Sequence, residues 1–240
     1  MKLMTHVVVG YPNLRETERI VAALAQHSDI IELQIPFSDP VADGPVIMEA
    51  NDVAVQGGIT PDKCLAFAKK ITKKHPETKF YFMSYFNPIY RAGIAQFVKA
   101  AARNGIKGFI VPDLPVEEAQ EFLKECRRNK LNFVFVVAPN TSKERLKKIV
   151  RQARGLIYCV ARLGVTGKQS SFGVELKKFL KRIKKLSGLP LAVGFGIMKK
   201  ADLAAIRSSG GDIAVIGSEI IRQHKKGGAA KVEKFIKSLI

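Results

Sequence analysis

The sequence is poor in cysteine and contains no long apolar segment. Its three cysteines, Cys64, Cys126 and Cys159, are far apart, odd in number and form no C-x-x-C pair. This argues against a disulfide framework and against a metal site, and it fits a reducing cytosol. No apolar run approaches the roughly 18 residues of a membrane span, so we expect no contact with a membrane. A strand pattern begins almost at the first residue and leaves no room for a signal peptide, which predicts a cytoplasmic protein.

Acidic residues are scarce in the second half of the chain. Residues 1–120 contain 13 basic and 13 acidic side chains, so the net charge of +19 arises after them. Such an excess can indicate nucleic-acid binding. Aromatic side chains that could stack on bases are, however, scarce among these lysines and arginines. We therefore expect a solvated outer helix face that attracts anionic metabolites, and no nucleic-acid partner.

Short β-branched apolar runs alternate with longer charged segments of helical periodicity. The eight runs are residues 6–9, 30–35, 80–84, 108–111, 133–137, 156–160, 191–194 and 213–216. Helix-start residues open the segments between them, as in Thr141-Ser142-Lys143-Glu144. This alternation predicts a parallel sheet, and the number of units predicts an α/β protein with one (β/α)8 TIM-barrel domain over residues 1–240. The alternative is a doubly wound open sheet, but no G-x-G-x-x-G follows the first run.

Glycines follow the last three apolar runs, where barrel enzymes of this type place their phosphate sites. Gly167 follows the sixth run, Gly196 the seventh, and Gly217-Ser218 the eighth. Glycine lets the backbone approach an anion closely, and amides at a helix start point toward it. A single glycine at a strand end is usually only a turn former. Glycines at the same place after three consecutive strands favour a substrate that carries a phosphate.

A glutamate lies within the second apolar run. Because side chains alternate along a strand, Ile30, Glu32 and Gln34 share one face and Ile31 and Leu33 the other. If Leu33 packs under the helices, Glu32 points into the barrel, where loss of water raises a carboxyl pKa toward the range useful for proton transfer. The alternative is a structural glutamate paired with a base. No basic residue recurs on the neighbouring strand interiors, which favours catalysis.

A second carboxyl group and a phenol complete the candidate acid/base site. Asp43 follows in a loop punctuated by Pro36, Pro40 and Pro45, where it should stay ionised. Two carboxyl groups in different environments are a recognised acid/base pattern. The alternative for Asp43 is a turn or helix-cap role, which fits Asp39 better. Tyr158 has the strand parity to reach the same pocket, but it is equally compatible with a structural role.

The segment from residue 31 to residue 45 reads IELQIPFSDPVADGP and resembles the signature of tryptophan synthase alpha chains. The runs YFNPI, PDLP, APN, GVTG, GFG and GS at residues 85–89, 112–115, 138–140, 164–167, 194–196 and 217–218 extend the resemblance along the chain. The resemblance implies a lyase that splits indole-3-glycerol phosphate into indole and glyceraldehyde 3-phosphate by a retro-aldol reaction. It implies no cofactor in this chain. It also implies a partner, the beta subunit, which carries pyridoxal phosphate and receives the indole.

The resemblance also assigns roles to individual residues. Glu32 would protonate indole C3 and later take the glycerol hydroxyl proton, Asp43 would accept the indole N–H, and Tyr158 would line the pocket. The positions that match residues lining the site or positioning its loops are Ile47, Asn51, Tyr85, Asp113 and Thr166. The positions that match the phosphate cradle are Gly167, Gly196, Gly217 and Ser218. Residues 162–171 match a mobile lid, and residues 38–40 and 87–88 match regions that face the beta subunit.

Some positions depart from the family pattern. Gln34 replaces a glycine and is expected to hydrogen-bond Glu32 or to narrow the indole pocket. His6 stands where a large apolar residue is usual, and we interpret it as a packing residue. Ala161 and Leu163 replace smaller or more polar lid residues. The N-terminal extension that normally closes the barrel bottom is expected to be nearly absent.

Two further functions remain open at the level of sequence. The first is a weakly catalytic alpha-like subunit that binds and activates a tryptophan synthase beta subunit, which the unusual Gln34 would explain. The second is another phosphate-binding barrel enzyme, such as an isomerase or epimerase. The lyase predicts that Asp43→Asn causes a large loss of activity, whereas the isomerase or epimerase predicts that activity survives.

Overall fold

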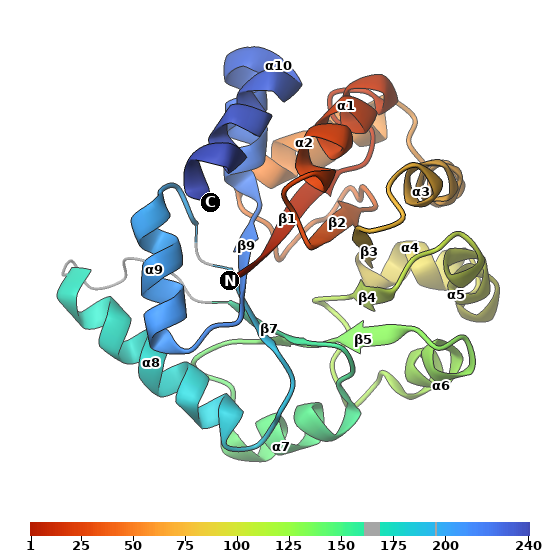
Figure 1. Ribbon diagram of the computed structural model, residues 1–240. Coiled ribbons are helices and arrows are strands. Elements are labelled where there is room, and N and C mark those ends of the chain that lie inside the picture. Colours follow the sequence, from red (N-terminus) through yellow and green to blue (C-terminus); the bar gives the residue numbers. More distant parts are fainter. Residues whose placement is uncertain (161–168, 195) are drawn as a thin grey trace.

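Strands and helices alternate in the computed structural model, which describes residues 1–160, 169–194 and 196–240 (Figure 1). The strands are β1 (Lys2–Val8), β2 (Ile30–Gln34), β3 (Lys79–Met83), β4 (Gly108–Ile110), β5 (Asn132–Val134), β6 (Val136–Val137), β7 (Ile157–Val160), β8 (Leu191–Gly194) and β9 (Ile213–Ile216). The helices are α1 (Leu14–Ala25), α2 (Pro45–Gln56), α3 (Pro61–Lys74), α4 (Phe86–Arg91), α5 (Ile94–Arg103), α6 (Gln120–Arg128), α7 (Lys143–Gln152), α8 (Gln169–Lys184), α9 (Lys200–Ser209) and α10 (Ser218–Leu239).

The strands form one parallel sheet that closes into a barrel inside a ring of helices (Figure 1). The sheet order is β5-β4-β3-β2-β1-β9-β8-β7-β6. Its two end strands, β5 and β6, follow one another in the chain with only Phe135 between them. The predicted TIM-barrel fold is therefore confirmed, and the open doubly wound sheet is wrong.

The fifth apolar run forms two short strands rather than the single strand expected from the sequence. Its first half, β5, pairs with β4 through residues 132–134, and its second half, β6, pairs with β7 through residues 136–137. The backbone changes partner at Phe135, whose carbonyl oxygen accepts a hydrogen bond from the Tyr158 amide at 3.0 Å. A barrel of eight apolar runs thus contains nine strands in the described part of the chain.

Strand parity divides the apolar side chains into two layers. Ile31, Leu33 and Ile35 of the second run pack outward in the large cluster under the helices. Ile30 points inward and joins Met4, Tyr81 and other interior side chains in a smaller cluster within the barrel. Because neighbouring positions on one strand face opposite layers, polar side chains in phase with Ile30 must lie inside the barrel.

Side-chain caps open helices in the structure, among them the helix start that the sequence predicts at residues 141–144. The Ser142 hydroxyl oxygen accepts from the Arg145 amide at the start of α7, and the Asn13 side chain does the same for Glu16 at the start of α1. Each of these bonds satisfies an amide that the helix itself leaves free. Each of these two helices begins within a few residues of the strand before it, α1 after β1 and α7 after β6.

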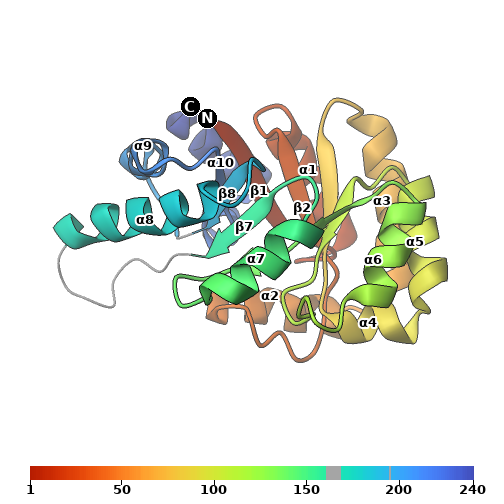
Figure 2. The same ribbon diagram turned by 90° about the horizontal axis from the view of Figure 1, so that it is seen from below.

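The strands begin at one end of the barrel and finish at the other. In Figure 2 both termini lie at one end, and α2 and α4 lie at the opposite end. Since β1 begins at Lys2 and all strands are parallel, their carboxyl ends face α2 and α4. In barrels of this type catalytic residues gather at the carboxyl ends.

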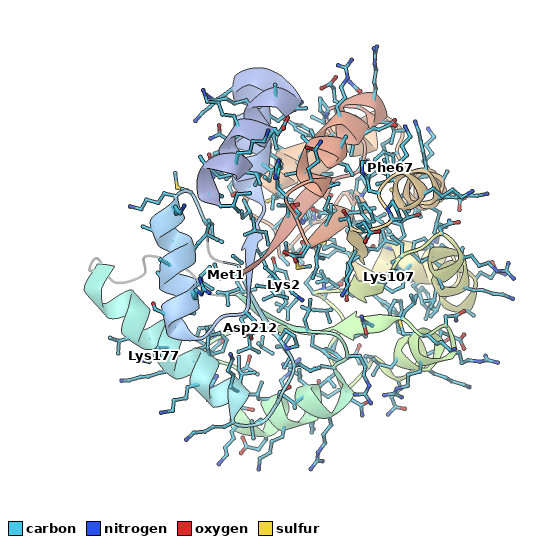
Figure 3. All side chains as sticks on the ribbon, viewed as in Figure 1. Met1, Lys2, Phe67, Lys107, Lys177 and Asp212 are labelled. Atoms are coloured by element: carbon cyan, nitrogen blue, oxygen red, sulfur yellow. The ribbon has the colours of Figure 1, made fainter. Side chains whose placement is uncertain are left out.

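The basic side chains of the second half lie on the outer helix surface, as the sequence predicts. Figure 3 shows side chains projecting outward around the ring, with Lys177 on the outer side of α8. Lys124, Lys148 and Lys234 are likewise exposed. No helix in the described part of the chain is both long and apolar enough to cross a membrane.

Candidate active site

A narrow cavity of about 120 Å³ opens at the carboxyl ends of the strands. Residues from β1, β2, β3, β4, β6 and β7, from the loops after β2, β4 and β9 and from α2 converge on it. The lining residues are His6, Glu32, Ala42, Asp43, Ile47, Met83, Ile110, Pro112, Val136, Tyr158, Val160 and Gly217. Five residues that the sequence predicts for the site lie together here, namely Glu32, Asp43, Tyr158, Ile47 and Gly217.

Glu32 and His6 form a buried pair on neighbouring strands. The register of β1 and β2 places the two residues side by side, and both side chains point into the barrel. The Nδ1 atom of His6 lies 2.8 Å from Oε2 of Glu32, and the two residues are 4% and 2% exposed. The other oxygen, Oε1 of Glu32, is buried without a hydrogen-bond partner in the described structure. One carboxylate oxygen is thus held by the protein and one is left for a ligand.

Gln34 connects this pair to Asp43. The Oε1 atom of Gln34 lies 2.7 Å from Nε2 of His6, and its Nε2 atom donates to Oδ2 of Asp43 at 2.7 Å. The same Asp43 oxygen accepts a hydrogen bond from the Tyr85 hydroxyl at 3.0 Å. The two candidate catalytic carboxyl groups are therefore joined through side chains inside the barrel.

The electrostatics of His6 follow from these neighbours. Burial alone would lower the pKa of the imidazole, but the hydrogen bond and negative charge of Glu32 outweigh it. The charge of Asp43 and the hydrogen bond to Gln34 act in the same direction, so the pKa of His6 is raised above its usual value. The site therefore favours a protonated imidazole among the carboxyl groups.

Tyr158 places its phenol against the same cavity from β7. Burial raises the pKa of this phenol well above its usual value, and the negative charges of Glu32 and Asp43 add to the effect. The hydroxyl therefore keeps its proton. It also lies close to the β8 backbone, since a Cβ on Gly194 would stand 3.1 Å from the Tyr158 oxygen. Tyr158 can therefore serve the cavity as a neutral hydrogen-bond donor, but not as a base.

The candidate phosphate residues lie at the ends of β8 and β9, which are neighbours in the sheet. Gly217 lines the cavity and precedes α10, and Ser218 is the first residue of that helix. Gly196 has a positive φ of 79° and is exposed, so its backbone takes a conformation that favours glycine. Gly167 and Thr166 lie outside the described residues, as do Ala161 and most of the predicted lid, including Leu163.

Asn51 and Asp113 hold loops around the site rather than facing the cavity. The Asn51 side chain accepts from the Phe37 amide at 3.1 Å and donates to the Ile47 carbonyl at 2.9 Å. Both oxygens of Asp113 accept from the Phe86 amide, at 3.0 and 3.1 Å, at the start of α4. Burial raises the pKa of Asp113. Asp113 is absent from the cavity lining, so its contribution here is to fix the loop after β3.

The structure changes the interpretation of two residues at this site. His6 is not a simple packing residue, because both ring nitrogens make hydrogen bonds to polar side chains. Gln34 hydrogen-bonds His6 and Asp43 rather than Glu32, and the alternative expectation that it narrows the indole pocket stays a prediction. The signal for both was the presence of polar residues at equivalent positions of two adjacent apolar strands. Its meaning depends on the register of β1 and β2, which the sequence alone did not provide.

A larger hollow of about 1060 Å³ lies at the opposite end, where the strands begin. Figure 3 labels Met1, Lys2 and Asp212 of its lining near the barrel axis. Catalytic residues of this fold come from the other end, so the smaller cavity is the candidate active site. Across the described residues there is no group of three or more His, Cys, Asp and Glu side chains that could hold a metal ion.

The amino-acid sequence matches one family model and several curated relatives over most of its length. The family model described as tryptophan synthase alpha chain matches residues 1–239. The tryptophan synthase alpha chain of Desulforapulum autotrophicum is 44% identical over 238 residues, which cover 99% of this chain and 93% of the relative. That of Methanocaldococcus jannaschii is 41% identical over 215 residues, which cover 90% of this chain and 76% of the relative.

Solved structures agree with the sequence matches. A chain of the tryptophan synthase α2β2 complex from Pyrococcus furiosus superposes with a TM-score of 0.91 at 33% identity. The match covers 99% of this chain and 97% of the other. A chain of tryptophan synthase from Mycobacterium tuberculosis gives a TM-score of 0.90 at 29% identity, covering 99% of this chain and 91% of the other. The similarity thus extends over the whole barrel.

Proposed function

Because the chain belongs to the tryptophan synthase alpha chain family, we propose that Glu32 and Asp43 perform the reaction of that family in the cavity at the carboxyl ends of the strands. The reaction is the cleavage of indole-3-glycerol phosphate in tryptophan biosynthesis, and the chain is a carbon–carbon lyase. The observation that carries the residue assignment is the buried, unpartnered Oε1 of Glu32 in a cavity shared with Asp43.

Glu32 is the proton-transfer group in this proposal. It gives a proton to indole C3, which prepares the bond between the ring and the glycerol chain for cleavage. It then takes the proton of the adjacent glycerol hydroxyl as the aldehyde forms, so the residue returns to its starting state. Proton transfer by a carboxyl group requires that it lie within hydrogen-bond reach of the reacting atom, directly or through one water molecule. The free Oε1 supports this role, since the other oxygen is occupied by His6.

Asp43 stabilises the positive charge that the ring acquires when C3 is protonated. Its carboxylate accepts the indole N–H, and the ring nitrogen then shares the charge with a fixed anion. Preorganised groups of this kind are effective because they need no rearrangement during the reaction. Hydrogen bonds from Gln34 and Tyr85 to one Asp43 oxygen support the proposal, since they fix the carboxylate in place. Tyr158 and Ile47 border the indole ring.

The phosphate of the substrate binds at the rim beyond the cavity, at Gly196, Gly217, Ser218 and Gly167. The start of α10 supplies amide groups and the positive end of a helix dipole. The position of Gly217 in the cavity lining supports this placement, because it connects the helix start to the reacting end of the substrate. Asp113 keeps the loop after β3 in place, and the role that the family resemblance gives to Thr166 falls outside the described residues.

The partner of this chain is a tryptophan synthase beta subunit, in an α2β2 complex. Solved complexes of that composition contain chains similar to this one, which supports the assignment. Two apolar side chains stand out at the same end of the barrel: Val41, in the loop after β2, is 82% exposed, and Tyr90 of α4 is 63% exposed. β2 and β3 are adjacent, so the two loops offer one continuous surface to the partner.

Three further assignments belong to the proposal. The chain needs no cofactor of its own, and pyridoxal phosphate resides in the beta subunit. The protein acts in the cytoplasm, where its free, buried cysteines stay reduced. Residues 1–240 act as one domain.

The decisive experiment measures glyceraldehyde 3-phosphate released from indole-3-glycerol phosphate, with and without a purified beta subunit. We expect Glu32→Gln and Asp43→Asn each to lower kcat by roughly 10²–10⁴. The matched controls are Glu117→Gln and Asp62→Asn, which change exposed residues outside the cavity and should retain wild-type rates.

Each alternative function has its own signature in this assay. A weakly catalytic alpha-like subunit would stimulate the beta reaction with serine and indole but release no glyceraldehyde 3-phosphate. Another phosphate-binding barrel enzyme would leave indole-3-glycerol phosphate intact in every arm. Near wild-type cleavage by Glu32→Gln would show that the acid/base assignment is wrong.

A further inference from the structure

A continuous chain of hydrogen bonds crosses the barrel interior from Glu32 to Asp43. Its bonds join Glu32 to His6 at 2.8 Å, His6 to Gln34 at 2.7 Å and Gln34 to Asp43 at 2.7 Å. His6 and Gln34 are 4% and 0% exposed, so water does not compete for these bonds. Burying a polar side chain costs free energy because the side chain loses its hydrogen bonds to water. That loss is compensated only when well-placed protein partners replace the water.

The directions of these bonds are fixed by chemistry at the Asp43 end. An ionised carboxylate only accepts hydrogen bonds, so Gln34 must turn its amide nitrogen toward Asp43. Its amide oxygen then faces His6 and accepts from the Nε2–H of the ring. The remaining ring nitrogen, Nδ1, lies 2.8 Å from Oε2 of Glu32, and a hydrogen bond at this distance requires a proton on one of the two atoms.

We infer that His6 and Gln34 are positioning residues of the lyase site: His6 holds Oε2 of Glu32 so that Oε1 faces the substrate, and Gln34 couples His6 to Asp43. The inference rests on the proposed function for the identity of the reacting groups. Neither residue touches the reacting atoms. The two carboxyl groups act as a linked unit, because a change in the position of either one is transmitted through the same pair of side chains.

The two oxygens of Glu32 have different roles in proton transfer. The proton given to indole C3 leaves from Oε1, and the proton taken from the glycerol hydroxyl returns to Oε1. The proton between His6 and Oε2 stays in place throughout. While Glu32 is a carboxylate, the protonated His6 stabilises its charge, which a neutral packing residue could not do.

A protonated His6 makes the linked unit sensitive to alkali. The titratable groups that face His6 are Glu32 of β2, Asp43 of the following loop and Tyr158 of β7. β9, the other neighbour of β1, ends at Ile216, and Gly217 directly after it lies beside the His6 side chain. When His6 loses its proton, Nδ1 has no hydrogen to offer and a lone pair faces Oε2. The activity should therefore fall as the pH rises through the raised pKa of His6.

Three substitutions at His6 test its hydrogen bonds to Glu32 and to Gln34 separately. His6→Asn keeps a donor near the position of Nδ1 and retains the bond to Glu32. His6→Gln keeps one near Nε2 and retains the bond to Gln34, and His6→Phe retains neither. His75→Asn, at the far end of α3, is the matched control. All are assayed as the complex with the beta subunit, from pH 6 to 10, after thermal unfolding has verified that each variant is folded.

We expect His6→Phe to lower kcat by up to about 100-fold while KM changes little, because misplacement of a reacting group has that effect. His6→Asn should recover most of the loss, and all three variants should lack the alkaline decline of the wild type. The inference is overturned if His6→Phe keeps the wild-type kcat, if His6→Asn is no better than His6→Phe, or if the alkaline decline persists.

A second measurement does not depend on catalysis. In the full chain labelled with nitrogen-15 at histidine, the His6 ring, identified by its loss in His6→Phe, should carry protons on both nitrogens to higher pH than His75. The substitution Glu32→Gln should lower the His6 pKa. A neutral His6 ring throughout this range overturns the inference even in an active enzyme. A wild type that releases no glyceraldehyde 3-phosphate but has a protonated His6 contradicts the proposed function instead.

Discussion

The side-chain amide of Gln34 donates a hydrogen bond to Oδ2 of Asp43 at 2.7 Å. The same oxygen accepts from the hydroxyl of Tyr85, so two donors hold one oxygen of this carboxylate. Hydrogen bonds to a charged group contribute about 1.5–3 kcal/mol each, more than bonds between neutral groups. Gln34 stands where the family pattern has glycine, and the contact therefore supplies Asp43 with a partner that a glycine could not provide.

Gln34→Gly removes the bonds to both Asp43 and His6. We expect kcat for the cleavage of indole-3-glycerol phosphate to fall by about tenfold, because Asp43 and Glu32 lose their common support. Steady-state kinetics of the complex with the beta subunit measures the effect. A variant as fast as the wild type would show that the amide is dispensable and that Gln34 merely fills space.

Tyr85→Phe should lower stability more than activity. The Tyr85 hydroxyl donates to Asp43 and accepts from the Ala42 amide at 3.0 Å, so its removal loosens the loop that carries Asp43. We expect the free energy of unfolding in urea to drop by about 1–3 kcal/mol, the effect of leaving buried polar groups without a partner. Tyr90→Phe is the control, because Tyr90 is 63% exposed and should be neutral. Equal effects from the two substitutions would contradict this account.

The stability of the protein should depend on pH through His6. Its folded-state pKa is raised above the ordinary value of 6.5, so its proton stabilises the folded state fully below pH 6.5. This contribution is lost as the pH rises through the raised pKa. The difference in unfolding free energy between wild type and His6→Asn should therefore shrink between pH 6 and pH 9, whereas His75→Asn should show no such trend. A constant difference would mean that His6 is not protonated in the folded protein.

Gly108 should tolerate no side chain. A Cβ at this position of β4 would stand 2.6 Å from the Asn132 carbonyl oxygen and 2.7 Å from the Tyr81 ring. Overpacking of this kind costs about 1–3 kcal/mol. Gly108→Ala should therefore lower the unfolding free energy by that amount. In Gly173→Ala, within α8, the added Cβ meets no described atom within 4 Å, and the substitution should raise the unfolding free energy by about 0.5–1 kcal/mol, since alanine favours helix. Urea unfolding of both variants measures these changes, and the unfolding free energy should fall in Gly108→Ala and rise in Gly173→Ala.

The fold was predictable because each strand is a local signal. Apolar runs of β-branched residues and the helix starts between them determine the order of elements, and that order leaves few topologies. The break at Phe135 had no such signal. The run from 133 to 137 is uniformly apolar, and its division depends on which neighbour each half pairs with, which is a property of the closed barrel.

The site was predictable to the extent that strand alternation and family resemblance allowed. The orientation of Glu32 into the barrel follows from the parity of β2 and is confirmed by the cavity lining. The catalytic roles of Glu32 and Asp43 stay predictions. His6 was misinterpreted because a single histidine in an apolar strand gives no local indication of its partners. Only the pairing of β1 with β2 places it opposite Glu32.

The fifth apolar run is divided into β5 and β6, and the junction between these two strands at Phe135 is a seam in the barrel wall. β4 and β5 share three ladder pairs and β6 and β7 two, whereas β1 and β2 share five. Strand pairs with few hydrogen bonds open first in local unfolding. Amide hydrogen exchange should therefore be faster in β5 and β6 than in β1 and β2. His6, Glu32 and Gln34 stand on β1 and β2, on the far side of the sheet order. When the ladders of β5 and β6 open, the wall that carries these three side chains should therefore stay paired.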